Sequence, residues 1–561
     1  MPDFKKNKDA FIVLQINRRF LPAWLLGIPF SYFILGFLGN FYTTGIEFIP
    51  VSIIIHSGVL LFGSYLMSRV QREYRSKPVD VTIYAALALA LTVFLALLVN
   101  MALRFPNVFD RFIYLIDPGL LVYFFIGIAA AFPVAVWVSN FAEKKDFKNS
   151  RFFLFVDKHL DGLLLAAFFF TVYLLIASIF NQPLFNYDDL FFDTDAKLWR
   201  TRFATESYRD YFERPVHPLV LMVVRPFVRL ISLFLKGDTF YAAVVLVALT
   251  GALSVFLVWY FVKETTGSSL YAALVGALFG GSTSQMIFGS FMETYVFLGA
   301  AALIFIVLLL KDMPTYTLVL TGIAAFGITI SNFAQTVFAH ILVKRNLKQW
   351  IIYGAIVTVL VFPLNILNNY IYPNASPYFW DFKALGWEEK NVFPVNLQRA
   401  NYLGRVMVMS SFVAPEPLLL KEYPPILKVW LFRASIRKAP TQIAQYYGWF
   451  ETSVAYLWLG FVALGGLLFL KNLRKQDMRF PLTFIVTILF YFALHLQYGK
   501  DVFLYAANWT YAITLFLALA WQELSKKRWF QFSLLGFVSL MLVNNTRLIF
   551  FMLTAAFLHT R

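Results

Sequence analysis

Residues 160–180 read LDGLLLAAFFFTVYLLIASIF and contain a single charged residue, Asp161. About 20 apolar residues in helical conformation are enough to cross the hydrocarbon core of a bilayer. Similar blocks recur along the chain, in which 60% of the 561 residues are hydrophobic and only 14% are charged. A soluble protein needs roughly a quarter of its residues charged. The sequence therefore predicts an all-α polytopic membrane protein and excludes a soluble enzyme, a disordered protein and a disulfide-built secreted module.

The apolar blocks predict about 13–16 membrane spans in total. Two of the blocks, 333–343 and 548–559, are short for a complete span. The candidate spans lie near residues 20–40, 48–68, 79–101, 120–139, 160–180, 240–262, 269–288, 294–310, 316–332, 333–343, 350–371, 452–470, 481–497, 503–522 and 529–543.

Basic residues indicate the orientation of these spans, because loops rich in Lys and Arg stay in the cytoplasm. Such residues cluster at the N-terminus (Lys5, Lys6, Lys8, Arg18, Arg19) and in the loops 69–77, 144–151, 344–348, 471–479 and 526–528. We therefore expect a cytoplasmic N-terminus, with the long loops 181–239 and 372–449 outside the cytoplasm. The second of these should form short helices on the membrane or a small cap. The net charge of +17 then reflects topology and anionic lipid, and no nucleic-acid partner is expected.

Most of the polar chemistry lies in residues 186–217, NYDDLFFDTDAKLWRTRFATESYRDYFERPVH, which hold seven carboxylates interleaved with Lys and Arg. Asp193 and Asp195 flank Thr194, so both point to one face of an extended segment. This geometry suits a shared divalent ion (Mg²⁺ or Mn²⁺) or an acid–base pair. A solvated loop, balanced by its own arginines, is the alternative.

Two further segments combine polar and apolar residues. Residues 217–235 contain Arg225, Pro226 and Arg229, which predicts an interfacial amphipathic helix whose arginines reach lipid phosphate. His217 is either part of a site or only the residue that starts this helix. Glu293, between two apolar spans, is either a functional carboxylate or a helix cap.

The order of these features resembles the GT-C superfamily of membrane glycosyltransferases, and most of all its protein O-mannosyltransferase and lipid A aminoarabinose-transferase branch. The resemblance implies a catalytic or metal-binding acid in the first loop, which corresponds to Asp193 or Asp195, with Asp193 preferred. It implies a second acid at Glu293 and an interfacial His-Pro at His217. The late segment Lys500-Asp501-Val502-Phe503-Leu504-Tyr505 corresponds to a basic, tyrosine-bearing segment that meets the carrier phosphate.

The resemblance further implies an inverting transfer of sugar from a polyprenyl-phosphate donor to a lipid, glycan or protein acceptor. The reaction would take place on the extracytoplasmic side, as in cell-envelope glycosylation at a bacterial inner membrane. The leaving phosphate needs cations, for which Arg200, Arg202 and Lys500 are candidates, with ordinary loop charge as the alternative. We expect a catalytic core over residues 151–561, preceded by an accessory four-helix unit over residues 1–150.

The sequence departs from the family in these four additional spans and in Ser331-Asn332-Phe333, where the family has a Lys. Two other functions stay open: a transporter or flippase of a lipid-linked saccharide, and a non-catalytic scaffold. Transport predicts a cavity open to both sides of the membrane. Transfer predicts a cavity closed to the cytoplasm, at which Asp193 and Glu293 converge, whereas a scaffold predicts no convergence with residues 289–293 or 500–505.

Overall fold

The computed structural model describes residues 19–185, 187–421, 425–431 and 440–560. The basic residues Lys5, Lys6, Lys8 and Arg18 lie outside them. Within these ranges the chain is mostly helical, and ten helices are long and apolar enough to cross a membrane. The prediction of an all-α polytopic membrane protein is thereby confirmed. The GT-C arrangement, the count of about 13–16 spans and the orientation stay predictions.

The ten long helices are α2 (Phe20–Gly39), α3 (Gly45–Ser76), α4 (Pro78–Leu103), α5 (Leu121–Lys144), α6 (Arg151–Phe180), α9 (Thr239–Thr266), α15 (Leu347–Ile371), α18 (Trp449–Asn472), α19 (Arg479–Gln497) and α21 (Arg528–His559). Four shorter helices are also apolar: α10 (Ser269–Gly280), α12 (Thr294–Leu310), α13 (Thr315–Ile328) and α20 (Ala507–Ala520). The remaining α-helices are α7 (Ala196–Ala204), α8 (Val220–Phe234), α11 (Thr283–Phe288), α14 (Asn332–Lys344), α16 (Phe382–Leu385) and α17 (Leu397–Arg405).

Tighter or wider helical turns and four very short strands complete the described structure. The 3₁₀ turns are η2 (Arg111–Tyr114), η3 (Pro118–Leu120), η4 (Phe147–Asn149), η5 (Gly386–Asn391), η7 (Val502–Tyr505) and η8 (Gln522–Leu524), and η6 (Val406–Ser410) is a π-helical turn. The strands form two antiparallel pairs, β1 (Leu418–Leu420) with β2 (Ile426–Lys428) and β3 (Trp430–Leu431) with β4 (Gln442–Ile443).

One predicted boundary between spans is absent from the structure. The blocks 529–543 and 548–559 belong to a single helix, α21, which continues through the polar residues Asn544 and Asn545. Asn545 donates hydrogen bonds to the carbonyls of Gly281 (2.9 Å) and Phe412 (2.8 Å). Because neighbouring backbone satisfies this side chain, the polar residues do not have to interrupt the helix.

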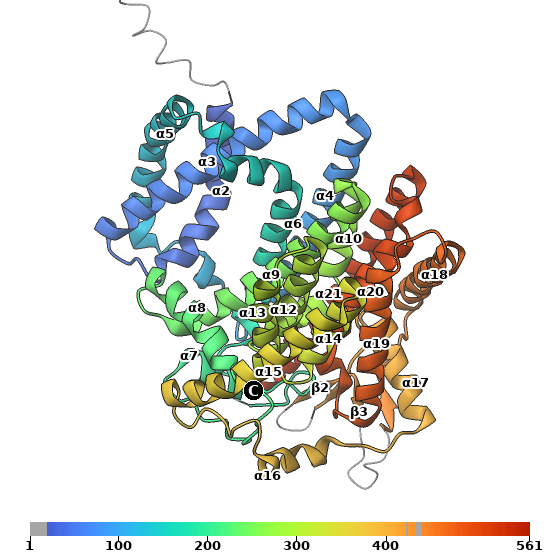
Figure 1. Ribbon diagram of the computed structural model, residues 1–561. Helices are drawn as coiled ribbons and strands as arrows, with labels where there is room; N and C mark the ends of the chain where they lie inside the picture. The colour runs from blue at the N-terminus through green and yellow to red at the C-terminus, as the bar shows by residue number, and fades with distance from the viewer. Residues whose placement is uncertain (1–18, 186, 422–424, 432–439, 561) are drawn as a thin grey trace, which may run out of the picture. The chain divides into compact units, whose positions relative to one another are not determined.

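The described chain divides into two compact units. The first contains the described residues up to Ala85 together with Asp110–Lys158, and the second contains Ala86–Phe109 with the described residues from His159 onward. In the first unit, α2, α3 and α5 pack together (Figure 1) around buried Leu35, Phe48 and Phe124. The prediction of an accessory unit over residues 1–150 is not tested by this division and stays a prediction.

In the second unit, three segments that are distant in the sequence meet at one end of the helices. The Phe191 backbone forms a parallel bridge with Leu427, the Asp210 N–H donates to the Ala375 carbonyl (3.0 Å), and Phe393 donates to Gln497 (2.6 Å). In Figure 1 this end carries α7, α16, α17, β2 and β3. The loop 372–449 thus contains short helices together with two small sheets, and its contact with the membrane stays a prediction.

Helix α8 presents an apolar face, with Phe227, Leu230 and Leu233 exposed by 54–74%. The prediction that Arg225 reaches out to lipid phosphate is wrong, because its side chain is buried on the opposite face. It donates to the Arg202 carbonyl (2.9 Å) and pairs with Glu206 (3.0 Å).

Candidate functional site

The acidic loop after α6 is folded into a tight turn. The Asp189 N–H donates to the Thr194 carbonyl (2.9 Å), and the Thr194 N–H donates to the Phe191 carbonyl (3.1 Å). Asp189, Phe192 and Asp193 adopt left-handed backbone angles, with φ between 59° and 68°. Aspartate tolerates this region better than most residues, but Phe192 is held there by the surrounding packing. The turn therefore presents its carboxylates in fixed directions.

Asp193 joins the turn to two distant parts of the chain. Its carboxylate forms an ion pair with Lys428 Nζ at the end of β2 and accepts the backbone N–H of Asp501 (3.0 Å). Asp501 in turn accepts the N–H groups of Val429 (2.8 Å) and Phe503 (3.0 Å). Burial and the neighbouring Asp193 raise the pKa of Asp501 to about 7. The Asp193 and Asp501 carboxylates thus connect three segments: the acidic turn, the end of β2 and residues 501–503.

Asp195 lies at the start of α7 and pairs with Arg214, whose Nη1 is 2.8 Å from Oδ2. Burial raises the pKa of Asp195 to about 6, and Arg214 opposes this rise. A carboxylate of this kind is ionised above pH 6 and still basic enough to accept a proton near neutrality.

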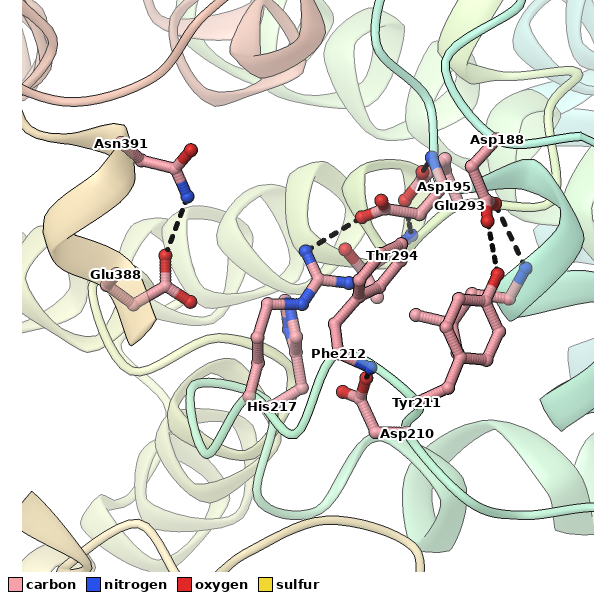
Figure 2. A network of polar contacts seen from close by, with 12 residues as sticks. Asp188, Asp195, Asp210, Tyr211, Phe212, His217, Glu293, Thr294, Glu388 and Asn391 are labelled. Atoms are coloured by element: carbon pink, nitrogen blue, oxygen red, sulfur yellow. Dashed lines mark hydrogen bonds and ion pairs between the residues drawn. The ribbon is translucent and has the colours of Figure 1, made fainter. Parts of the chain in front are cut away.

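Glu293 binds the backbone N–H of Asp195 through its carboxylate. It is 1% exposed, and its Oε1 accepts the Asp195 N–H (2.6 Å) while Oε2 accepts the Thr294 N–H at the start of α12 (3.0 Å). Figure 2 shows Glu293 and Asp195 side by side. Burial, followed by the charge of Asp195, raises the pKa of Glu293 well above its usual value. Glu293 therefore caps α12 and positions the Asp195 backbone, and a catalytic role for Glu293 stays a prediction.

An open cleft of about 90 Å³ lies in front of these carboxylates. Four of the residues predicted from the sequence, Asp193, Asp195, Lys500 and Tyr505, lie at this cleft together. The complete lining is Asp189, Asp193, Asp195, Phe212, Arg214, Lys390, Asn391, Lys500, Asp501, Leu504 and Tyr505. The cleft therefore combines carboxylates, cations and aromatic rings from three separate loops.

The other predicted residues lie outside this lining. His217 is buried, with Nδ1 2.7 Å from the Ile328 carbonyl oxygen. Burial lowers the pKa of His217 to about 3, so its ring is neutral at physiological pH. Arg200 donates to the Gln182 carbonyl (3.1 Å), and Arg202 donates to the Ala375 carbonyl (2.8 Å). The positions of both arginines favour a structural role, and substrate contact by these three residues stays a prediction.

Among the charged residues of this site, Arg214, Asp501, Lys390 and Lys428 were not given individual roles from the sequence. Arg214 and Asp501 occur inside the stretches singled out for their charge. Arg214 could therefore have been predicted from the sequence as a charge partner for Asp195. Lys390 and Lys428 lie in the loop 372–449 and carry no local signal. Only the folding of that loop onto the acidic turn brings them to the carboxylates.

The carboxylates do not form an evident metal cradle. Calcium and magnesium sites require several free oxygens converging on one point. The Asp193 carboxylate already binds Lys428 and the Asp501 N–H, and Asp195 binds Arg214. In the described ranges, no three His, Asp or Glu side chains are grouped as metal ligands. A Mg²⁺ or Mn²⁺ ion at Asp193 and Asp195 stays a prediction, and no step below passes through it.

Replacing Glu293 by Ala is expected to destabilise the protein by roughly 1–3 kcal/mol, because the buried N–H groups of Asp195 and Thr294 lose their acceptor. The measurement is chemical unfolding in detergent micelles. Glu143→Ala is the control: Glu143 is exposed and 4.0 Å from Lys148, and its replacement should change stability by no more than about 0.5 kcal/mol. Equal stability of the two variants would contradict the positioning role of Glu293.

No family model matches the chain, and no curated protein or solved structure matches it either.

Proposed function

We propose that the chain is an integral membrane glycosyltransferase of the GT-C type, which transfers a sugar from a polyprenyl-phosphate donor to an acceptor at this cleft. One observation carries the proposal: carboxylates and cations from three distant loops line a single cleft at one end of a bundle of apolar helices. Sugar transfer from a phosphate carrier needs both kinds of charge. By analogy with the family, the cleft lies on the extracytoplasmic side of a bacterial inner membrane.

Asp195 is the base in this proposal. The acceptor hydroxyl gives its proton to the Asp195 carboxylate while its oxygen forms a bond to the anomeric carbon. The bond between that carbon and the carrier phosphate breaks, and its electron pair leaves with the phosphate. The positive charge that develops on the sugar is stabilised by the carboxylates around it. Asp193 is less suited to be the base because both of its carboxylate oxygens are engaged, one by Lys428 and the other by the Asp501 N–H, whereas Arg214 pairs with Asp195 through Oδ2.

Lys390 and Lys500 are the cations best suited to the carrier phosphate. Both line the cleft, and among the described residues neither forms an ion pair with a carboxylate. The Lys390 ammonium group lies over the Trp387 ring, 4.4 Å from its centroid, which leaves its charge available. Arg214 and Lys428, by contrast, already neutralise Asp195 and Asp193.

The contacts of the acidic turn also bear on the alternatives. A scaffold would not need Asp195 to meet Glu293, nor Asp193 to meet Asp501, yet both contacts are present. A transporter would need a path to the other side of the membrane. The cleft lining belongs to loops at one end of the second unit, which supports transfer over transport.

The test is reconstitution of the full chain in proteoliposomes with a panel of polyprenyl-phosphate sugars, with and without candidate acceptors. Formation of a glycosylated product by the wild type, and its loss in the Asp193→Asn/Asp195→Asn double variant, would support the proposal. A fluorescent lipid-linked saccharide reports translocation in the same vesicles. Translocation without product would instead assign the chain to transport.

The rate of transfer is expected to fall as the pH is lowered through about 6, the value to which burial raises the pKa of Asp195. Below this pH the carboxyl group is protonated and cannot accept the acceptor's proton. The measurement is the initial rate between pH 4.5 and pH 8, with folding followed in parallel by circular dichroism. A rate that stays constant down to pH 4.5 would contradict the assignment of Asp195 as the base.

A further inference from the structure

Lys428 is seated among the carboxylates of the acidic turn. Its ammonium group forms an ion pair with Asp193, and Asp501 and Asp189 are close enough to raise its pKa although its burial opposes this. The same carboxylates act on one another: burial, followed by the charge of Asp193, raises the pKa values of Asp189 and Asp501. Neighbouring carboxylates in a buried setting repel one another, and a cation among them relieves this repulsion.

The backbone around Lys428 is fixed to the acidic turn itself. The Leu427 N–H donates to the Leu190 carbonyl (2.8 Å), and the Phe192 N–H donates to the Leu427 carbonyl (2.7 Å). The next residue, Val429, donates its N–H to Asp501 (2.8 Å). Hydrogen bonds of the residues on both sides of Lys428 therefore hold its ammonium group next to the carboxylates of the acidic turn and Asp501.

We propose that Lys428 is the resident cation of this cluster and takes the place that a divalent metal ion would otherwise occupy. The role is one of positioning: the ammonium group pairs with the Asp193 carboxylate and holds the acidic turn, in which Asp189, Phe192 and Asp193 have left-handed backbone angles, in place. The part of the inference that concerns catalysis rests on the proposed function, and its consequence is sugar transfer without a divalent metal.

The other contacts of the carboxylates agree with this assignment. Both Asp501 side-chain oxygens accept backbone N–H groups, and the two Asp193 oxygens are divided between Lys428 and the Asp501 N–H. A metal ion would have to displace the ammonium group and several of these N–H donors. Lysine, with three donors on a compact charge, fits the space that they leave.

The experiment uses the full-length protein after extensive treatment with EDTA. Mn²⁺ binding is followed by electron paramagnetic resonance, the unfolding temperature is measured with and without MnCl₂, and transfer is assayed with and without methylammonium. For the wild type we expect no Mn²⁺ binding that depends on Asp193, and no effect of EDTA on transfer. Lys428→Ala should lose at least tenfold in transfer and regain part of it with methylammonium.

Two further variants cover the case in which Lys428→Ala unfolds. Lys428→Arg keeps the charge and should keep most of the unfolding temperature. The double variant Lys428→Met/Asp193→Asn removes both charges and should unfold at a higher temperature than Lys428→Met alone, since it leaves no carboxylate at position 193. Lys383→Ala is the matched control, because Lys383 lies in the same loop 372–449 but is exposed and outside the cleft lining. Its transfer rate and unfolding temperature should equal those of the wild type, with or without methylammonium.

Stoichiometric Mn²⁺ binding by the wild type that is lost in Asp193→Asn would overturn the inference. So would a Lys428→Ala variant that matches the wild type in unfolding temperature. Mn²⁺ binding and the unfolding temperature can be measured without catalysis. They therefore test the role of Lys428 even if no sugar donor is turned over and the proposed function fails.

Discussion

Replacing Asp195 by Asn is expected to reduce the rate of sugar transfer by a factor of about 10² to 10⁴, the usual contribution of a positioned general base. The amide keeps the size of the side chain and an oxygen for Arg214, which lies 2.8 Å from the carboxylate. The backbone N–H that binds Glu293 is unchanged. The fold should therefore persist while proton acceptance is lost.

The measurement is the initial rate of product formation at pH 7.5 with both substrates saturating. Asp312→Asn is the control, because it makes the same chemical change at an 89% exposed side chain paired with Lys344, remote from the cleft in sequence. Its rate should equal that of the wild type. If Asp195→Asn retains full activity while Asp193→Asn abolishes it, the base is Asp193, as the family resemblance favours.

The largest effect on stability is expected at Arg202, whose replacement by Met should cost about 3–5 kcal/mol. The guanidinium group is 1% exposed and lies 3.5 Å from Asp210, whose side chain is 0% exposed. It also donates to the carbonyls of Tyr208 (3.2 Å) and Ala375 (2.8 Å). Removing it leaves the buried Asp210 carboxylate without its cation and takes one donor from each of the two carbonyls, of which Ala375 keeps the Asp210 N–H.

Chemical unfolding in detergent measures this cost. Arg209→Met is the matched control, because the Arg209 side chain is 68% exposed and its loss should matter little. The double variant Arg202→Met/Asp210→Asn should be more stable than the sum of the single changes predicts, since no carboxylate is left at position 210. If Arg202→Met instead folds normally and raises the KM for the donor, the sequence-based prediction of substrate contact is correct.

Local sequence patterns were sufficient to predict which parts of the chain are helical. The block 160–180 lies within α6, and the block 240–262 lies within α9. Both contain enough apolar residues for a bilayer, and this requirement does not depend on the neighbours of a helix. The patterns gave wrong predictions where contacts with other parts of the chain determine the structure. Asn544 and Asn545 do not end α21, and Arg225 is buried because it donates to the carbonyls of Arg202 and Thr205.

The candidate site was predictable only in part, because the contacts of its residues also depend on distant parts of the chain. Asp193 and Asp195 were singled out by their spacing in the acidic loop, and the family resemblance pointed to them and to Lys500 and Tyr505; all four line the cleft. Arg200 and Arg202 were predicted, like Lys500, as cations for the leaving phosphate. Their burial and their carbonyl partners, which the sequence cannot give, set them apart from the cleft cations.

The sequence by itself determined that this protein is helical, that it belongs in a membrane and that many of its charged residues gather in a few loops. These properties follow from composition and from the length of apolar blocks, which are local quantities. Only the tertiary structure decided which charges meet. Lys428 is separated from Asp193 by more than 200 residues of chain and pairs with it because the loop after α15 folds back onto the loop after α6. Charges separated in sequence interact strongly only when folding brings them together and excludes water.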